Sequence, residues 1–201
     1  MTKKEEMIQQ RRLLLAVSVA LCLPLISGCA TKIKASTAHN PAPAEAFSHY
    51  GRIHVAPVGF AAGFRGNQAA LGKIHDNLTK NLSEPLQQWN RAPMNGRTLT
   101  IEPVVHDMSF KSTTKRVFLG PLAGSSGVLL RLTMRDNTGK VVASPEFFQR
   151  AGAMSGGFTL GVQDNLMLTR VSKLATDYVI ANYTQAVGGP TGADDAAIAA
   201  H

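Results

Sequence analysis

Residues 127–135 alternate between two kinds of side chain, and this pattern restricts the fold more than any other part of the sequence. Every second residue is apolar, whereas the positions between them include Arg131 and Arg135. Because successive side chains of a strand point to opposite faces, the pattern predicts a strand with one apolar and one basic face. Residues 136–139 have the composition of a turn, so residues 141–150 are predicted to return as the hairpin partner.

Two longer segments have the periodicity of amphipathic helices. In 69–89 and in 163–183, apolar residues recur three or four positions apart and form one stripe. The segments 51–60 and 98–110 contain β-branched residues and leucine in a strand-like pattern. The order β-α-β-β-β-α predicts an α/β fold of the α+β type, in which a small, mostly antiparallel sheet is backed by two helices.

Three prolines predict irregularities in these elements. Pro57 suggests an edge or bulge position in the first strand, and Pro103 a second irregularity in the strand that follows the first helix. Pro85 lies within the apolar stripe of the first helix. Its missing N–H and its ring are expected to kink that helix, or to start a new turn after Ser83.

The N-terminal segment is typical of a secretory signal peptide. Four basic residues outnumber two acidic ones before residue 13, and an apolar run over 13–26 follows. That run is too short to span a bilayer comfortably. It is also the only long apolar run, so the sequence excludes a membrane protein with several spans.

The apolar run ends in Ile26-Ser27-Gly28-Cys29, which resembles the lipobox of bacterial lipoproteins. The resemblance implies cleavage before Cys29 and attachment of lipid to its thiol, so that the chain is held on a membrane. Ala30 stands where an aspartate favours retention in the inner membrane, which indicates the periplasmic face of the outer membrane. The alternative is an uncleaved N-terminal anchor in which Cys29 is buried and inert.

The chain has only two cysteines, and Cys22 would be removed with the signal peptide. The mature chain would then contain one lipidated cysteine. Under this interpretation an intramolecular disulfide, a cysteine nucleophile and a thiolate metal site are all excluded. The fold must therefore be held by its core alone.

Composition suggests four parts. We expect a lipoprotein signal peptide at 1–28, a lipidated cysteine and flexible tether at 29–46, a single α/β domain at 47–186 and a disordered tail at 187–201. The tether contains prolines and small polar residues without apolar periodicity, and the tail is rich in Gly, Ala and Asp.

No motif predicts catalysis, a metal or a cofactor. The glycine-rich segment 120–127 lacks the lysine and the following helix of a phosphate loop, and it is one residue short of a nucleophile elbow. The six histidines make no metal-ligand spacing, and the acidic residues of the domain are scattered singly. His106 and Asp107 are the only adjacent histidine and aspartate near the end of a predicted strand. A hydrolase site assembled around them, with Ser109, is the enzymatic alternative.

The predicted domain is basic, with 15 Lys and Arg against eight acidic residues. Lys115 and Arg116 precede the glycine-rich segment, and Arg131 and Arg135 lie on the hairpin. Export removes nucleic acid as a natural partner, which leaves lipopolysaccharide, anionic lipid and peptidoglycan as available polyanions. The basic residues are interpreted either as a polyanion-binding surface or as a solvated sheet face.

Short motifs also resemble a known lipoprotein family. These motifs are the opening strand 53–60, the segment 115–128 and the hairpin 136–141, and they are similar to those of the family called domain of unknown function 4410. The likeness covers about residues 50–184 and departs from the alternating glycines of the family at 120–122. The resemblance implies an α/β domain of periplasmic lipoprotein type and supplies no activity and no catalytic residue.

Together these features favour a lipid-anchored, non-enzymatic envelope protein that faces the periplasm. We expect a sheet edge or hairpin edge to bind a protein partner or a cell-wall polymer. The alternatives are the hydrolase around His106 and Asp107, and the polyanion binder.

Overall fold

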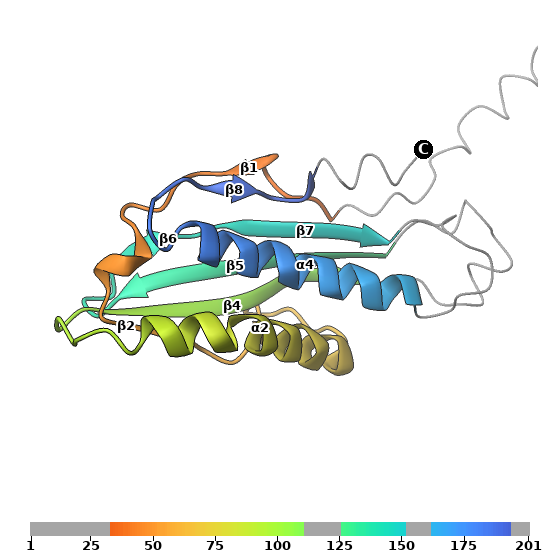
Figure 1. Ribbon diagram of the computed structural model, residues 1–201. Helices are drawn as coiled ribbons and strands as arrows, with labels where there is room; N and C mark the ends of the chain where they lie inside the picture. Colours follow the sequence, from red (N-terminus) through yellow and green to blue (C-terminus); the bar gives the residue numbers. More distant parts are fainter. Residues whose placement is uncertain (1–32, 111–125, 152–161, 194–201) are drawn as a thin grey trace, which may run out of the picture. The chain divides into compact units, whose positions relative to one another are not determined.

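The computed structural model describes residues 33–110, 126–151 and 162–193. The chain divides into two compact units, Met1–Ala30 and Thr31–His201, and every described residue belongs to the second. Figure 1 shows this unit as one sheet with two long helices on the same face and a short ribbon near one edge.

The predicted α+β fold is confirmed. The long helices are α2 (Gln68–Trp89) and α4 (Val162–Ala181), and a 3-10 turn precedes them at Phe47–His49. The main sheet contains β2 (Arg52–Val55), β3 (Gly59–Phe60), β4 (Thr98–Ser109), β5 (Ser126–Asp136), β6 (Val141–Ala143) and β7 (Glu146–Ala151). Two short strands, β1 (His39–Asn40) and β8 (Gly189–Pro190), form a ribbon of their own.

The sheet is mostly antiparallel. β4 and β5 form its centre, β6 and β7 both pair with β5 on one side, and β2 and β3 both pair with β4 on the other. β2 and β3 run parallel to β4, because α2 carries the chain back before β4 begins. The predicted hairpin partner of β5 is divided into β6 and β7.

The core lies between the sheet and the two helices. The apolar stripe of α2 is buried at Ala70, Ile74, Leu78 and Leu82. The alternating positions of β5, from Val128 to Met134, are buried as the sequence predicts. The opposite face of the sheet therefore carries the remaining, more polar side chains of the same strands.

The prolines of the sheet act together rather than separately. β4 continues through Pro103 and stays paired with β5 there, so the irregularity predicted at this residue is not found within β4. The register shift of β4 lies further along, between Val105 and Asp107. The N–H groups of Ala56 and Ala61 donate to the carbonyls of Ile101 and Val105, on either side of Pro103. Pro103 has no N–H to donate toward the strand beside it. The pairing is consequently interrupted between β2 and β3, which is where Pro57 lies.

Helix α2 runs through Pro85 to Trp89, so no new helix begins after Ser83. The missing proline N–H would have donated to the carbonyl of Asn81, an exposed residue of the helix. Water can solvate that carbonyl, which lowers the cost of keeping proline in the helix.

The terminal segments are part of the fold, and this corrects the predicted tether and tail. Ile33 and Ala35 are buried against Phe148, and β1 pairs with β8. The tether prediction is therefore wrong for residues 33–46, and the tail prediction is wrong for 187–193. These short segments are attached to the domain by individual side chains and not by a continuous apolar face. They therefore have no apolar periodicity from which their packing could be predicted. Residues 29–32 and 194–201 lie outside the described residues.

Candidate functional site: a groove beside an open strand edge

One edge of the sheet is closed by the terminal segments. The Phe148 N–H donates to the Thr191 carbonyl over 2.7 Å, and the Ala44 N–H donates to the Val142 carbonyl over 3.0 Å. The Asn40 side chain pairs with the backbone of Glu146, its Oδ1 accepting from the N–H and its Nδ2 donating to the carbonyl, both over 2.8 Å. Backbone groups on this edge that could bind another strand are thus largely occupied.

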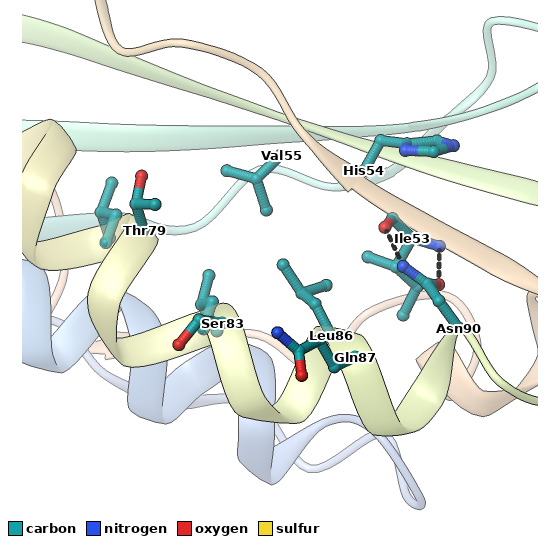
Figure 2. Close-up of a pocket in the computed structure, with 10 residues that line it drawn as sticks. Ile53, His54, Val55, Thr79, Ser83, Leu86, Gln87 and Asn90 are labelled. Atoms are coloured by element: carbon teal, nitrogen blue, oxygen red, sulfur yellow. Dashed lines mark hydrogen bonds between the residues drawn. The ribbon is translucent and has the colours of Figure 1, made fainter.

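The other edge, along β2, is closed at one residue only. The N–H groups of Arg52 and Ala56 donate to carbonyls at Arg97 and Ile101, so these alternate residues face β4. Ile53 and Val55 therefore direct their backbone groups away from the sheet. The Asn90 side chain satisfies Ile53, accepting from its N–H over 2.8 Å and donating to its carbonyl over 2.9 Å, as Figure 2 shows. No such partner is found for the backbone of Val55 among the described residues.

A groove of about 450 Å³ lies between this edge and α2, and we call it the β2–α2 groove. Its lining residues are Ile53, His54, Val55, Leu78, Thr79, Leu82, Ser83, Leu86, Gln87 and Asn90. Figure 2 shows Val55 directed into the space between the strand and the helix, whereas the His54 ring points to the other side of the strand. The floor is aliphatic, and the helix contributes small hydroxyl and amide side chains to the rim.

The groove lining is mainly apolar and uncharged. Apart from His54, whose ring points elsewhere, the described residues that line it include no titratable side chain. The Ser83 hydroxyl donates to the Lys80 carbonyl over 2.8 Å within the helix, so it is engaged in a local bond. Apart from the edge position suggested by Pro57, no sequence pattern predicts this groove.

The predicted basic residues of the hairpin lie where the sequence placed them, on the face opposite the core. Each is paired with a carboxylate there: Arg131 with Glu146, and Arg135 with Glu102 over 3.3 Å. These two pairs neutralise much of the charge that the polyanion hypothesis requires. Lys115 and Arg116, the other members of that set, lie outside the described residues.

His106 and Asp107 lie at the register shift of β4. Partial burial, and then the nearby Arg131 guanidinium, lower the pKa of His106, and Glu146 acts in the opposite direction. Among the described residues, no hydrogen bond joins the His106 ring to Asp107 or to Ser109. The structure therefore does not bring these residues together as a catalytic set.

Neither a metal-binding group nor a membrane-spanning helix is found in the described ranges. No group of three or more His, Cys, Asp and Glu side chains is placed to hold a metal ion there. Within the same ranges, no helix is both long and apolar enough to cross a membrane. Ile26, Ser27, Gly28 and Cys29 lie outside the described residues.

A charged cluster that the sequence did not reveal ties the start of the domain to β4. Arg97 donates to both carboxylate oxygens of Glu45, the Tyr50 hydroxyl donates to Glu45 Oε1 over 2.8 Å, and His49 Nδ1 lies 3.1 Å from Oε2. The Arg97 guanidinium lies 4.4 Å from the centre of the Tyr50 ring. Glu45 was assigned to the tether, so its role depends on contacts that periodicity cannot predict.

The cluster predicts a pH-dependent contribution to stability. The hydrogen bonds from Arg97, followed by that from Tyr50, lower the pKa of Glu45 from 4.5 to about 2. The ionised carboxylate therefore stabilises the fold fully above about pH 4.5, and this contribution is lost as the pH falls toward about 2. Glu45→Gln should cost about 1 kcal/mol at neutral pH and almost nothing near pH 2, measured by urea unfolding across the range. Glu84→Gln, at an exposed site of α2, is the control, and an equal cost of Glu45→Gln at both ends of the range would contradict the prediction.

Comparisons with known sequences give no match, and comparisons with solved structures give likenesses of low identity and low TM-score. No protein-family model matches the chain, and no curated protein sequence matches it. Among solved structures, a variant PelC dodecamer from Paraburkholderia phytofirmans is similar, with 14% identity, a TM-score of 0.38, and coverage of 69% of this chain and 93% of that chain. A PelC dodecamer from the same organism has 15% identity, a TM-score of 0.35, and coverage of 66% and 91%.

Proposed function

We propose that this chain is a lipid-anchored envelope protein of the periplasmic face of the outer membrane, whose folded domain is a non-enzymatic binding module. The observation that carries the binding role is the difference between the two sheet edges. Among the described residues, the β7 edge is closed by the terminal segments, whereas the β2 edge has no partner at Val55 and lies beside a groove. Proteins usually protect such edges, so an edge left open above an apolar floor is suited to a partner.

The anchoring role is supported by the sequence. A basic start, a short apolar run and the Ile26–Cys29 box occur in the order and spacing that lipidation requires. Two or more acyl chains on Cys29 would hold the protein on a bilayer, since each buried methylene contributes about 0.8 kcal/mol. The domain would then be presented to other envelope components, either proteins or the cell wall.

One experiment in intact cells tests both roles. A photo-crosslinking amino acid is placed at Gln87 in the β2–α2 groove, in the otherwise natural chain and in Cys29→Ser, and the cells are then fractionated. We expect the natural chain in the outer-membrane fraction with a crosslinked species of higher mass, and Cys29→Ser in the soluble periplasmic fraction. The same probe at Gln88, which is exposed on α2 outside the groove, is the matched control.

The two roles fail separately. If Cys29→Ser were still cleaved normally and yet remained in the membrane pellet after washing with salt, the anchoring role would be wrong. If Gln87 gave no crosslink beyond that of Gln88, the binding role of the groove would be wrong.

A further inference from the structure

We infer that the β2–α2 groove binds an extended, uncharged peptide segment of a partner protein, which adds to the outer edge of β2 as a further strand. This inference rests on the proposed binding role and adds the chemical class of the ligand and the atoms that recognise it. It is argued from the backbone of β2, from the Asn90 side chain and from the chemistry of the groove lining.

The backbone of Val55 supplies the hydrogen bonds. Ile53 and Val55 present their N–H and C=O groups on the same side of β2, because residues two apart in a strand face the same way. Asn90 occupies the groups of Ile53, and those of Val55 have no partner among the described residues. The N–H and C=O of Val55 can therefore bind the C=O and N–H of one residue in a neighbouring extended chain, and the apolar floor of the groove lies beside them.

Asn90 shows which geometry this edge accepts and where the ligand ends. Its primary amide offers one acceptor and one donor in a plane, as a peptide group does, and it bonds to Ile53 at 2.8 and 2.9 Å. An added strand pairing with Val55 therefore stops at Asn90, because that side chain fills the next position. The ligand enters from the Pro57 end, where β2 is interrupted.

The lining determines the side chains of the ligand. Val55, Leu82 and Leu86 form an apolar floor, and Thr79 and Ser83 keep the helix wall low enough for a backbone to approach. Within the described part of the chain, no Lys, Arg, Asp or Glu lines the groove. A segment with aliphatic side chains directed toward the floor, and without charges there, is accordingly the best fit.

Two other occupants fit less well. An acyl chain would cover the floor and leave the Val55 N–H and C=O without hydrogen bonds, which is unfavourable. A second copy pairing antiparallel through β2 and centred on Val55 would bring Ile53 of one copy opposite Pro57 of the other. The Ile53 N–H is already bound by Asn90, so it cannot donate to the Pro57 carbonyl of the other copy, whereas the corresponding residue of a peptide has a free N–H.

The test uses the full chain in detergent. Random short peptides displayed on phage are selected on it, a selected peptide is synthesised, and its affinity is measured by fluorescence polarisation. Gln87→Trp fills the rim of the groove, and Gln88→Trp makes the same change at the neighbouring exposed glutamine outside it. We expect Gln87→Trp to weaken binding by about tenfold or more and Gln88→Trp to change it less than about twofold.

A second readout distinguishes strand addition from other binding in the same groove. Amide hydrogen exchange of Val55 should slow by about tenfold or more when the peptide binds, because its N–H becomes hydrogen-bonded. A selected peptide that bound equally to both tryptophan variants, a selection that yielded no peptide sensitive to Gln87→Trp, or unchanged exchange at Val55 would each overturn the inference. If the cellular crosslink at Gln87 still formed, the binding role would stand while strand addition failed.

Discussion

Phe147→Ala should lower the free energy of unfolding by about 3–5 kcal/mol, because it removes a ring from the centre of the core. Phe147 is fully buried on the helix-facing side of β7, and its ring meets that of Tyr178 edge-on, with centroids 5.8 Å apart. The space left by the ring is bounded by a strand and by α4, neither of which can collapse into it without breaking pairing elsewhere. Urea unfolding followed by circular dichroism measures the loss.

Phe148→Ala is the informative comparison, since the neighbouring ring is equally buried on the opposite face of the same strand. Phe148 packs in a separate small cluster with Ile33 and Ala35. Its removal should release the terminal segments first, which would appear as faster amide exchange in β1 and β8 before global unfolding. A loss below about 1 kcal/mol for Phe147→Ala would show that the helices and the sheet do not share one core.

The parts of the fold that could be predicted are those in which a whole element buries one face. The alternation of 127–135 identifies β5 correctly, because the apolar residues from Val128 to Met134 all belong to the one core cluster that the helices also enter. The stripe of α2 was predictable for the same reason, and Pro85 does not change it because the stripe continues on both sides. Periodicity is a property of one segment, so it needs no knowledge of the partner.

The parts that could not be predicted depend on single side chains that meet across long separations in sequence. Asn40 reaches Glu146, and Glu45 reaches Arg97. Each of these residues lies in, or contacts, a segment without periodicity. The ion pairs of Arg131 and Arg135 could not be predicted either. Which carboxylate lies beside each arginine depends on the register of three strands, and the sequence pattern of one strand does not determine that register. The closure of the β2 edge at Ile53 likewise depends on one asparagine, Asn90, at the end of a helix.

Asn182→Ala should cost about 2–4 kcal/mol, although it removes no apolar surface. The Asn182 side chain is fully buried at the end of α4 and makes four hydrogen bonds with backbone groups. Its Nδ2 donates to the carbonyls of Tyr178 and Gly188, and its Oδ1 accepts from the N–H groups of Val187 and Gly188. Alanine removes the partners of the Val187 N–H and of the Gly188 N–H and carbonyl, since the methyl group can neither donate nor accept, whereas the Tyr178 carbonyl still accepts from the backbone N–H of residue 182.

The consequence should be local before it is global. Gly188 adopts a positive φ of 79°, and a Cβ there would lie 2.5 Å from the Asn40 carbonyl oxygen, so the turn held by Asn182 has little freedom to rearrange. We expect faster amide exchange at Val187 and Gly188 in Asn182→Ala, together with a lower urea midpoint. Asn81→Ala, at an exposed helix position, is the matched control and should change stability by less than about 0.5 kcal/mol. Equal effects of the two substitutions would contradict the prediction, because they would show that β1–β8 pairing and the bond from the Phe148 N–H to Thr191 hold the terminal ribbon without Asn182.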